Sequence, residues 1–163
     1  MKITVAVLFY LLFWFMCYLG TGTDKKNIKG FRSYPDEVQK RVLKNQELKR
    51  RAPKKTSILL TMISNMLMFA VIFFVMGIIF KNAFKFSNYL SAFVYFLILG
   101  EGLNLFDLIV IDLLWWRNSK RIRFSCVPQI EMYKNPRKHI ESFFRGIITF
   151  AISAVIGALC VII

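Results

Sequence analysis

Four long apolar blocks constrain the fold of this chain more than any other feature of its sequence. They cover residues 3–19, 57–80, 88–116 and 143–163. The first block is only just long enough to cross a bilayer, and each of the others meets the roughly 20 residues that a spanning helix needs. Because lipid offers no hydrogen-bond partners, backbone groups inside a span must bond within the span. We therefore predict an all-α integral membrane protein, with four transmembrane helices in a small bundle that forms a single membrane domain over residues 1–163.

The distribution of charge predicts how these helices are oriented. The chain has a net charge of +14, which in a soluble protein would suggest nucleic-acid binding. Here 12 of the 23 Lys and Arg residues lie in the connection at 20–56 and seven in the connection at 117–142, whereas residues 81–87 hold two. By the positive-inside rule the two basic connections are cytoplasmic, so both termini lie outside the plasma membrane. We expect the lipid bilayer, not nucleic acid, as the partner.

The first connection is long and strongly basic. Ser33 is a capping residue, Pro35 suits a first helical turn, and the acids after it suit the positive end of a helix dipole. These signals predict a basic amphipathic cytoplasmic helix from Pro35 to about Arg51, lying on anionic headgroups. The alternative is a solvated segment that only determines topology. The residues expected to bind lipid or a partner protein are Arg41, Lys44, Lys49, Arg50, Arg51, Lys54 and Lys55.

Acidic and amide side chains interrupt the third block. They are Glu101, Asn104, Asp107 and Asp112. A charged carboxylate at the centre of a bilayer costs at least about 2.5 kcal/mol. At about 100° per residue, all four side chains fall within an arc of about 140° on one side of an α-helix. These acids therefore need water, a partner or an ion.

The second block starts with a polar stripe in the same cytoplasmic half of the membrane. Ser57, Thr61 and Asn65 recur at helical spacing. We predict a polar cavity that opens to the cytoplasm between the second and third helices. Its lining is expected to include Ser57, Thr61 and Asp112, and its ion- or proton-binding residues are expected to be Glu101, Asp107, Asn104 and Asn65.

A purely structural network is the alternative interpretation of the same residues. Arg145 lies one turn inside the fourth block, at the depth expected for Asp112, so these two residues are predicted to form a structural ion pair. The fourth block also carries two pairs of small residues four apart, Ser153 with Gly157 and Ala154 with Ala158. Such pairs let helices approach closely, and we expect them to pack within the chain.

Three classes of function follow from these features. The first is a proton- or cation-coupled transporter, or a subunit of one, which four short helices would form as a homo-oligomer or with a membrane protein partner. The second is an accessory or assembly subunit of a larger membrane complex, which docks a partner or anionic lipid through its basic cytoplasmic face.

The third class is an enzyme that modifies lipid headgroups. Asp112 and His139 would act as acid or base, and the residues that would hold a phosphate are Arg117, Arg121, Arg123, Arg137 and Arg145. The chain has no catalytic motif that supports this class, so we do not expect an enzyme. Three cysteines without a C-x-x-C pair and a single histidine give no metal-ligand spacing, so neither a metal nor a cofactor is predicted.

Overall fold

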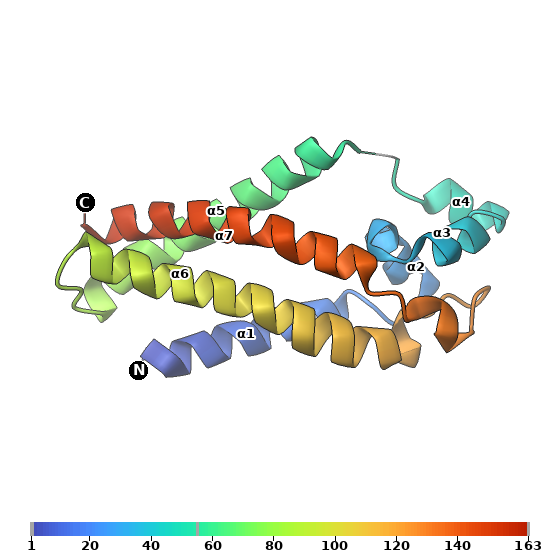
Figure 1. Cartoon of the computed structure of the whole chain (residues 1–163), viewed down its shortest axis with the longest axis horizontal. Helices are drawn as coiled ribbons and strands as arrows, with labels where there is room; N and C mark the ends of the chain where they lie inside the picture. Colours follow the sequence, from blue (N-terminus) through green and yellow to red (C-terminus); the bar gives the residue numbers. More distant parts are fainter. Residues whose placement is uncertain (1, 55, 163) are drawn as a thin grey trace. The chain divides into compact units, whose positions relative to one another are not determined.

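The computed structural model describes residues 2–54 and 56–162, and their regular structure is helical apart from one isolated bridge between Phe124 and Val127 (Figure 1). Four helical segments are long and apolar enough to cross a membrane. They are Lys2–Leu19, Ile58–Ala83, Tyr89–Asn118 and Ile130–Val161. The predicted all-α class and the four apolar segments are therefore confirmed.

The long helices are joined by two connections that contain short helices. The long elements are α1 (Lys2–Leu19), α5 (Ile58–Ala83), α6 (Tyr89–Phe106), the π-helical segment η2 (Asp107–Trp115) that follows α6, and α7 (Arg137–Ile162). The first connection contains α2 (Asp24–Asn27), η1 (Ile28–Ser33), α3 (Asp36–Val42) and α4 (Gln46–Arg51). The second contains η3 (Trp116–Asn118), η4 (Lys120–Ile122) and η5 (Ile130–Tyr133).

The chain forms two compact units. Unit 1 contains the described residues of Met1–Ala6, Thr56–Leu105 and Phe143–Ile163. Unit 2 contains the described residues of Val7–Lys55 and Phe106–Ser142. Unit 1 thus holds most of the apolar helices, and unit 2 holds both basic connections together with the acidic segment η2.

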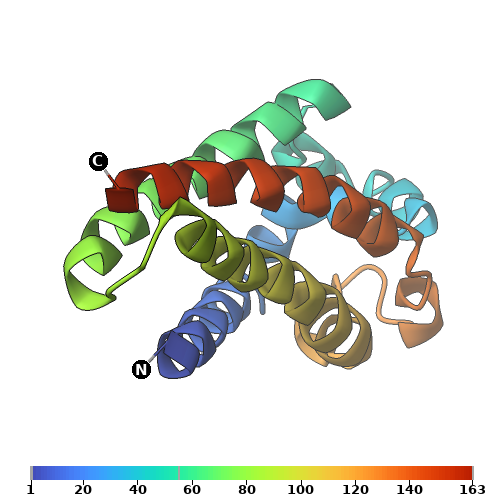
Figure 2. The same ribbon diagram turned by 60° about the vertical axis from the view of Figure 1, so that its left-hand side comes forward.

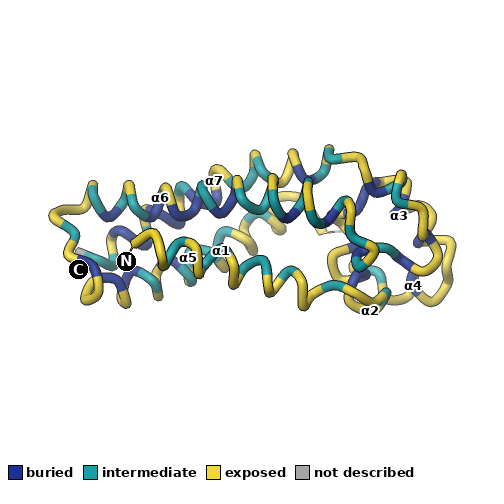
Figure 3. The backbone as a smooth tube through the Cα atoms, turned by 90° about the horizontal axis from the view of Figure 1, so that it is seen from below, coloured by how far each residue is buried: buried dark blue, intermediate teal, exposed yellow. Residues whose placement is uncertain are grey.

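Close helix packing in unit 1 depends on small residues. A Cβ atom at Gly77 of α5 would lie only 2.5 Å from the carbonyl oxygen of Gly157 on α7. The small residues Ser153, Ala154 and Ala158 of α7 are fully buried. Burial of these residues confirms that the predicted small-residue face packs within the chain. Figure 3 shows the buried stretches of α6 and α7 in dark blue.

The first half of α5 is much less packed than the second. Its buried residues are Phe73, Gly77 and Phe80, all in the second half. Figures 1 and 2 show the beginning of α5 lying away from α7. The polar stripe predicted on α5 therefore lies in the half of the helix that has no buried residue.

The N-terminal turn of α1 lies against the connection between α5 and α6. The Lys2 ammonium is 4.2 Å from the centre of the Phe86 ring. The Tyr95 hydroxyl donates a hydrogen bond of 3.4 Å to the Lys2 carbonyl oxygen. These contacts within unit 1 place Lys2 beside Phe84, Phe86 and Tyr95.

Unit 2 has a hydrophobic core that the sequence analysis did not predict. The core is aromatic and aliphatic and comes from both connections; its members are Ile28, Phe31, Tyr34, Val38, Val42, Leu48, Trp116, Ile122, Phe124, Val127 and Tyr133. The Tyr34 hydroxyl donates to the Ile122 carbonyl oxygen at 2.8 Å, and the Tyr133 hydroxyl donates to the Val127 carbonyl oxygen at 2.7 Å. The two connections therefore fold together as one body.

Polar side chains near α2 bind the second connection. Asn27 donates from its amide to the carbonyl oxygens of Arg121 and Arg123, at 3.1 Å and 3.3 Å. Its side-chain oxygen Oδ1 accepts from the Gly22 backbone N–H at 3.1 Å. The carboxylate of Asp24 accepts from the backbone N–H and the hydroxyl of Ser125. These bonds tie residues about a hundred positions apart in the sequence.

The single basic helix predicted for Pro35 to Arg51 is wrong. The structure has two short helices there, because the chain turns after Val42 and Asn45 begins a new helix. The Asn45 side chain accepts from the backbone N–H groups of Glu47 and Leu48, which is a strong start signal. The apolar residues Val38, Val42 and Leu48 of this segment are buried in the core of unit 2, so they do not form a lipid-facing side of one helix.

Candidate functional site

Two aspartates lie on a π-helical turn of unit 2. In the segment η2 (Asp107–Trp115), backbone hydrogen bonds join residues five apart. Asp107 and Asp112 are therefore neighbours on one face of this segment, and their charges interact. An α-helical period would place them about 140° apart, so the π-helical turn brings the two aspartates closer together than the sequence predicts. Turns of this kind are frequent at functional sites.

Asp112 is bonded to a buried histidine. The Nδ1 atom of His139 lies 2.9 Å from Oδ2 of Asp112, and the two side chains are only 5% and 15% exposed. The second ring nitrogen, Nε2, is buried and has no hydrogen-bond partner among the described residues. A buried polar atom without a partner costs about 1–3 kcal/mol, so this nitrogen lowers the stability of the fold.

Aromatic rings of the core hold the His139 ring in place. The Trp116 ring packs against it edge-on, with 4.7 Å between the ring centres. The centre of the Trp116 ring lies 4.7 Å from that of Tyr34 and 6.3 Å from that of Tyr133. The sequence predicts no role for Trp116 in this site, yet its ring joins His139 to the hydrophobic core of unit 2.

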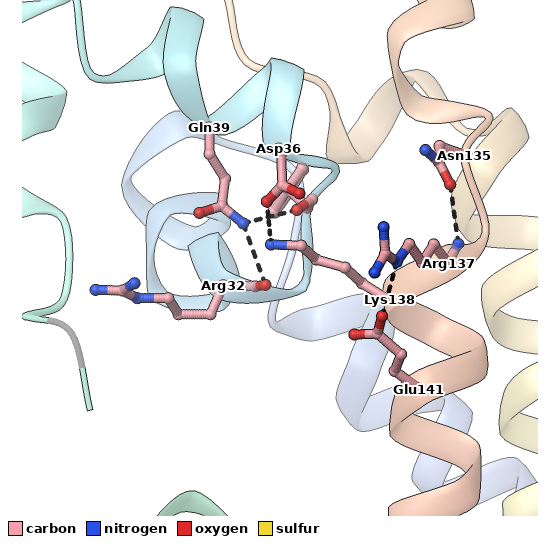
Figure 4. A network of polar contacts seen from close by, with 8 residues as sticks. Arg32, Asp36, Gln39, Asn135, Arg137, Lys138 and Glu141 are labelled. Atoms are coloured by element: carbon pink, nitrogen blue, oxygen red, sulfur yellow. Dashed lines mark hydrogen bonds and ion pairs between the residues drawn. The ribbon is translucent and has the colours of Figure 1, made fainter. Parts of the chain in front are cut away.

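The first turns of α7 present His139 to η2. Asn135 accepts from the backbone N–H of Arg137 at 3.0 Å, which fixes the beginning of the helix. Figure 4 shows Arg137 turned toward Glu141 and Lys138 reaching Asp36 on α3. The Lys138 ammonium lies 2.6 Å from the Asp36 carboxylate and lowers the pKa of that carboxyl. The first turn of α7 therefore contacts α3 through Lys138 and η2 through His139.

Cys17 is the other titratable group beside the aspartates. It lies on α1, close enough to Asp107 and Asp112 for their charges to act on its thiol. Aromatic contacts bring this part of α1 to η2, since the rings of Trp14 and Trp115 are 6.3 Å apart. The candidate site of unit 2 thus combines two carboxylates, one imidazole and one thiol from three helical elements.

A second polar group lies in unit 1. The Asn104 amide donates to Oε2 of Glu101 at 3.4 Å and to the carbonyl oxygen of Phe143 at 3.1 Å. A Cβ atom at Gly146 would lie 2.3 Å from the Asn104 side-chain oxygen, so the glycine makes room for this amide. Oε1 of Glu101 is buried and has no partner among the described residues. The predicted neighbours Glu101 and Asn104 are therefore brought together.

The polar stripe of α5 bonds mainly within its own helix. The Ser57 hydroxyl oxygen accepts from the Leu60 backbone N–H at 3.1 Å, and the Thr61 hydroxyl donates to the Ser57 carbonyl oxygen at 3.2 Å. Both residues and Asn65 are exposed. The predicted cavity would combine this stripe, in unit 1, with the aspartates of unit 2. It stays a prediction, as does the ion pair between Asp112 of unit 2 and Arg145 of unit 1.

The basic residues of the first connection are largely on the surface of unit 2. The exposed ones among those predicted to bind lipid or a partner are Arg41, Lys44, Lys49, Arg50, Arg51 and Lys54. Arg51 pairs with Glu47 at 3.0 Å. Lys55 lies outside the described residues. Because Val38, Val42 and Leu48 are buried in the core, the exposed surface of this connection is mainly basic.

The sequence predicts His139 only as an acid or base of the enzyme alternative. The sequence gives one indication of its pairing with Asp112. Asn135 and Pro136 are typical of a helix start, and they place His139 in the first turn of α7. The described residues contain no group of three His, Cys, Asp or Glu side chains placed to hold a metal ion. Comparisons of the chain with protein-family models, with curated proteins and with solved structures found no match.

Proposed function

We propose that the protein is a plasma-membrane protein that moves protons or other cations, as a transporter or a subunit of one. The observation that carries this proposal is the π-helical pair Asp107 and Asp112, bonded through Asp112 to the buried His139. Chains of Asp, Glu and His within membrane segments are typical of ion and proton pathways. In unit 1, Glu101 with its unpartnered buried oxygen is a further acid of the same kind.

Energetic cost is the physical reason to assign these acids a function. Each charged carboxylate at the bilayer centre costs at least about 2.5 kcal/mol, and two close carboxylates repel each other as well. An apolar segment would span the membrane without this cost. The simplest explanation for Glu101, Asp107 and Asp112 is that they bind and release a cation.

The proposed orientation places both basic connections in the cytoplasm. The positive-inside rule supports it, because 19 of the 23 cationic residues lie in those connections. The contact between Lys2 and Phe86 in unit 1 supports the same side for the N-terminus and for residues 81–88. Four spans enclose little volume, so we propose that the protein works as a homo-oligomer or with a membrane protein partner.

Reconstitution into liposomes tests this function. The purified full-length chain should carry protons or alkali cations down an imposed gradient, measured with an interior pH dye and with ion-selective dyes. Asp107→Asn and Glu101→Gln should each lower the flux by about tenfold or more, as removal of an acid–base group commonly does. Glu141→Gln, an exposed acid on α7, is the matched control and should leave the flux unchanged. Vesicles that are as tight with the protein as without it would contradict the proposal.

A second candidate function is favoured by the surface of unit 2. Asp24, Asp36 and Glu47 are already engaged with Ser125, Lys138 and Arg51. The remaining cations therefore leave a strong positive excess for anionic headgroups or for an acidic face of a partner. An accessory subunit would be recovered from mild detergent in a fixed ratio with another membrane protein. A protein that purifies alone and still conducts ions would favour transport.

A further inference from the structure

The structure points to the proton as the species bound at this site, with Nε2 of His139 as the atom that receives it. This inference deepens the proposed function and depends on it for the transport step, but proton binding itself is testable without transport. It starts from the hydrogen bond between His139 and Asp112. A carboxylate only accepts, so Nδ1 of His139 carries the hydrogen in that bond. In the neutral ring the other nitrogen, Nε2, is then a free acceptor.

The surroundings of Nε2 fit a proton better than a metal or alkali cation. Hard cations take six or more oxygen ligands, whereas this atom offers one nitrogen lone pair in a buried space. Oδ2 of Asp112 is already occupied by the Nδ1–H donor. A proton needs only the lone pair, and it can arrive and leave through a single water molecule.

Charge balance favours uptake of the proton. With a neutral ring, the Asp112–His139 pair has one negative charge in a buried place. Protonation at Nε2 converts it to an imidazolium–carboxylate pair with no net charge, which removes an unpaired buried charge. Two further titratable groups interact with Asp112: Asp107 on the same segment and Cys17 on α1. Lys138, the residue before His139 on α7, is bound to Asp36.

Asp112 and Trp116 act as positioning residues in this scheme. The bond to Asp112 determines which ring nitrogen of His139 can accept a proton. The Trp116 ring packs against the imidazole and restricts its orientation. Asp107, one π-helical turn from Asp112, is the next acceptor along η2. The proton order runs from the imidazole on α7 to Asp112 and then to Asp107 on η2. The imidazolium passes its Nδ1 proton to the Asp112 carboxylate and becomes a neutral ring with its hydrogen on Nε2, and the Asp112 carboxyl then passes a proton to the Asp107 carboxylate.

Nuclear magnetic resonance of the single histidine tests the binding step directly. The chain contains one histidine, so a sample labelled with ¹⁵N-histidine reports on His139 alone. We expect the neutral ring to carry its hydrogen on Nδ1, and the proton taken up on acidification to appear on Nε2. Asp112→Asn should redistribute the hydrogen between the two nitrogens. A ring that takes up no proton on acidification of the folded protein, or whose neutral form carries its hydrogen on Nε2, would overturn the inference.

Ion selectivity in liposomes separates this inference from the proposed function. His139→Gln should lower proton flux by about tenfold or more, while Arg137→Gln, an exposed neighbour in the same turn, should not. Sodium or potassium flux without proton flux would overturn the inference and leave the proposed transporter standing. Proton flux that survives His139→Gln but is lost in Asp107→Asn would also overturn it. Absence of any flux would instead refute the proposed function.

Discussion

Single side chains join the two connections of unit 2 through bonds to distant backbone carbonyl groups. Tyr34 is the clearest case, because its ring is buried among aromatic residues while its hydroxyl reaches the Ile122 carbonyl oxygen at 2.8 Å. Burial raises the pKa of this hydroxyl, which keeps it a donor at every physiological pH. Removing the hydroxyl would leave a buried carbonyl oxygen without its partner.

Tyr34→Phe should therefore destabilise the protein by about 1–3 kcal/mol, the cost of a buried polar group left unsatisfied. Tyr89→Phe is the matched control, because Tyr89 is at the exposed start of α6 and its change should have little effect. Thermal unfolding in detergent, followed by circular dichroism, measures the difference. Equal melting temperatures for the two variants would show that the Tyr34 hydroxyl contributes nothing.

The ion pair between Lys138 and Asp36 should make stability depend on pH. Its hydrogen bond from Lys138 lowers the pKa of Asp36 in the folded state. A lowered pKa contributes stability that is complete above the unfolded value, about pH 4, and is lost as pH falls further. Because the Asp36 side chain is largely exposed, the contribution is at most about 1 kcal/mol. Lys138→Met should thus destabilise more at about pH 7 than at about pH 3, with Lys134→Met as the control; the same difference at both values would contradict the pair.

Close packing between helices restricts substitutions more than most single side chains do. In this protein two helix backbones approach each other at a glycine. In unit 1, α5 and α7 approach so closely that a Cβ atom at Gly77 would lie 2.5 Å from the Gly157 carbonyl oxygen and 2.7 Å from the Cβ atom of Cys160. Neither of these atoms is the end of a flexible side chain. The two helices must therefore move apart to admit even a methyl group.

Gly77→Ala should destabilise the protein by about 1–3 kcal/mol through overpacking, although alanine is the better helix former by about 1 kcal/mol. Gly30→Ala makes the matched control, since a Cβ atom there would have no neighbour within 4 Å. Unfolding of both variants in the same detergent gives the comparison. A Gly77→Ala protein at least as stable as wild type would mean that α5 and α7 are not this close.

The π-helical element explains why the candidate site was only partly predictable. Hydrophobicity predicts that residues 88–116 form a helical segment long and apolar enough to span a membrane, with acids inside it, and this part of the prediction is confirmed. A switch from α- to π-helical bonding leaves no mark in the apolar pattern, so the proximity of Asp107 to Asp112 could not be predicted from spacing. The partner His139 comes from α7, and only tertiary structure brings it to Asp112.

For the whole molecule, the apolar blocks predicted the long helices to within a few residues. Residues 57–80 became α5 (Ile58–Ala83), and residues 3–19 became α1 (Lys2–Leu19). α7 starts earlier than predicted, at Arg137, because its first turns belong to unit 2. The core of unit 2 was missed because its apolar residues are scattered singly among cations in two distant connections.

The orientation of the whole molecule is testable with single cysteines. In a variant whose three cysteines are replaced by serine, Ser87→Cys should react with an impermeant maleimide added to intact cells. Lys44→Cys should react only after the membrane is permeabilised, because its connection is cytoplasmic in the proposed topology. Labelling of Lys44→Cys in intact cells would reverse the orientation and with it the side from which protons reach the site.

The most direct measurement for the account as a whole is a double-mutant cycle on proton flux into liposomes. Asp112→Asn, His139→Gln and the variant carrying both are compared with wild type at the same imposed pH gradient. If the two side chains act as one proton-binding unit, each single change should abolish most of the flux, and the double change should cost little more than either alone. Wild-type flux in the double variant, or losses that simply multiply, would contradict the account.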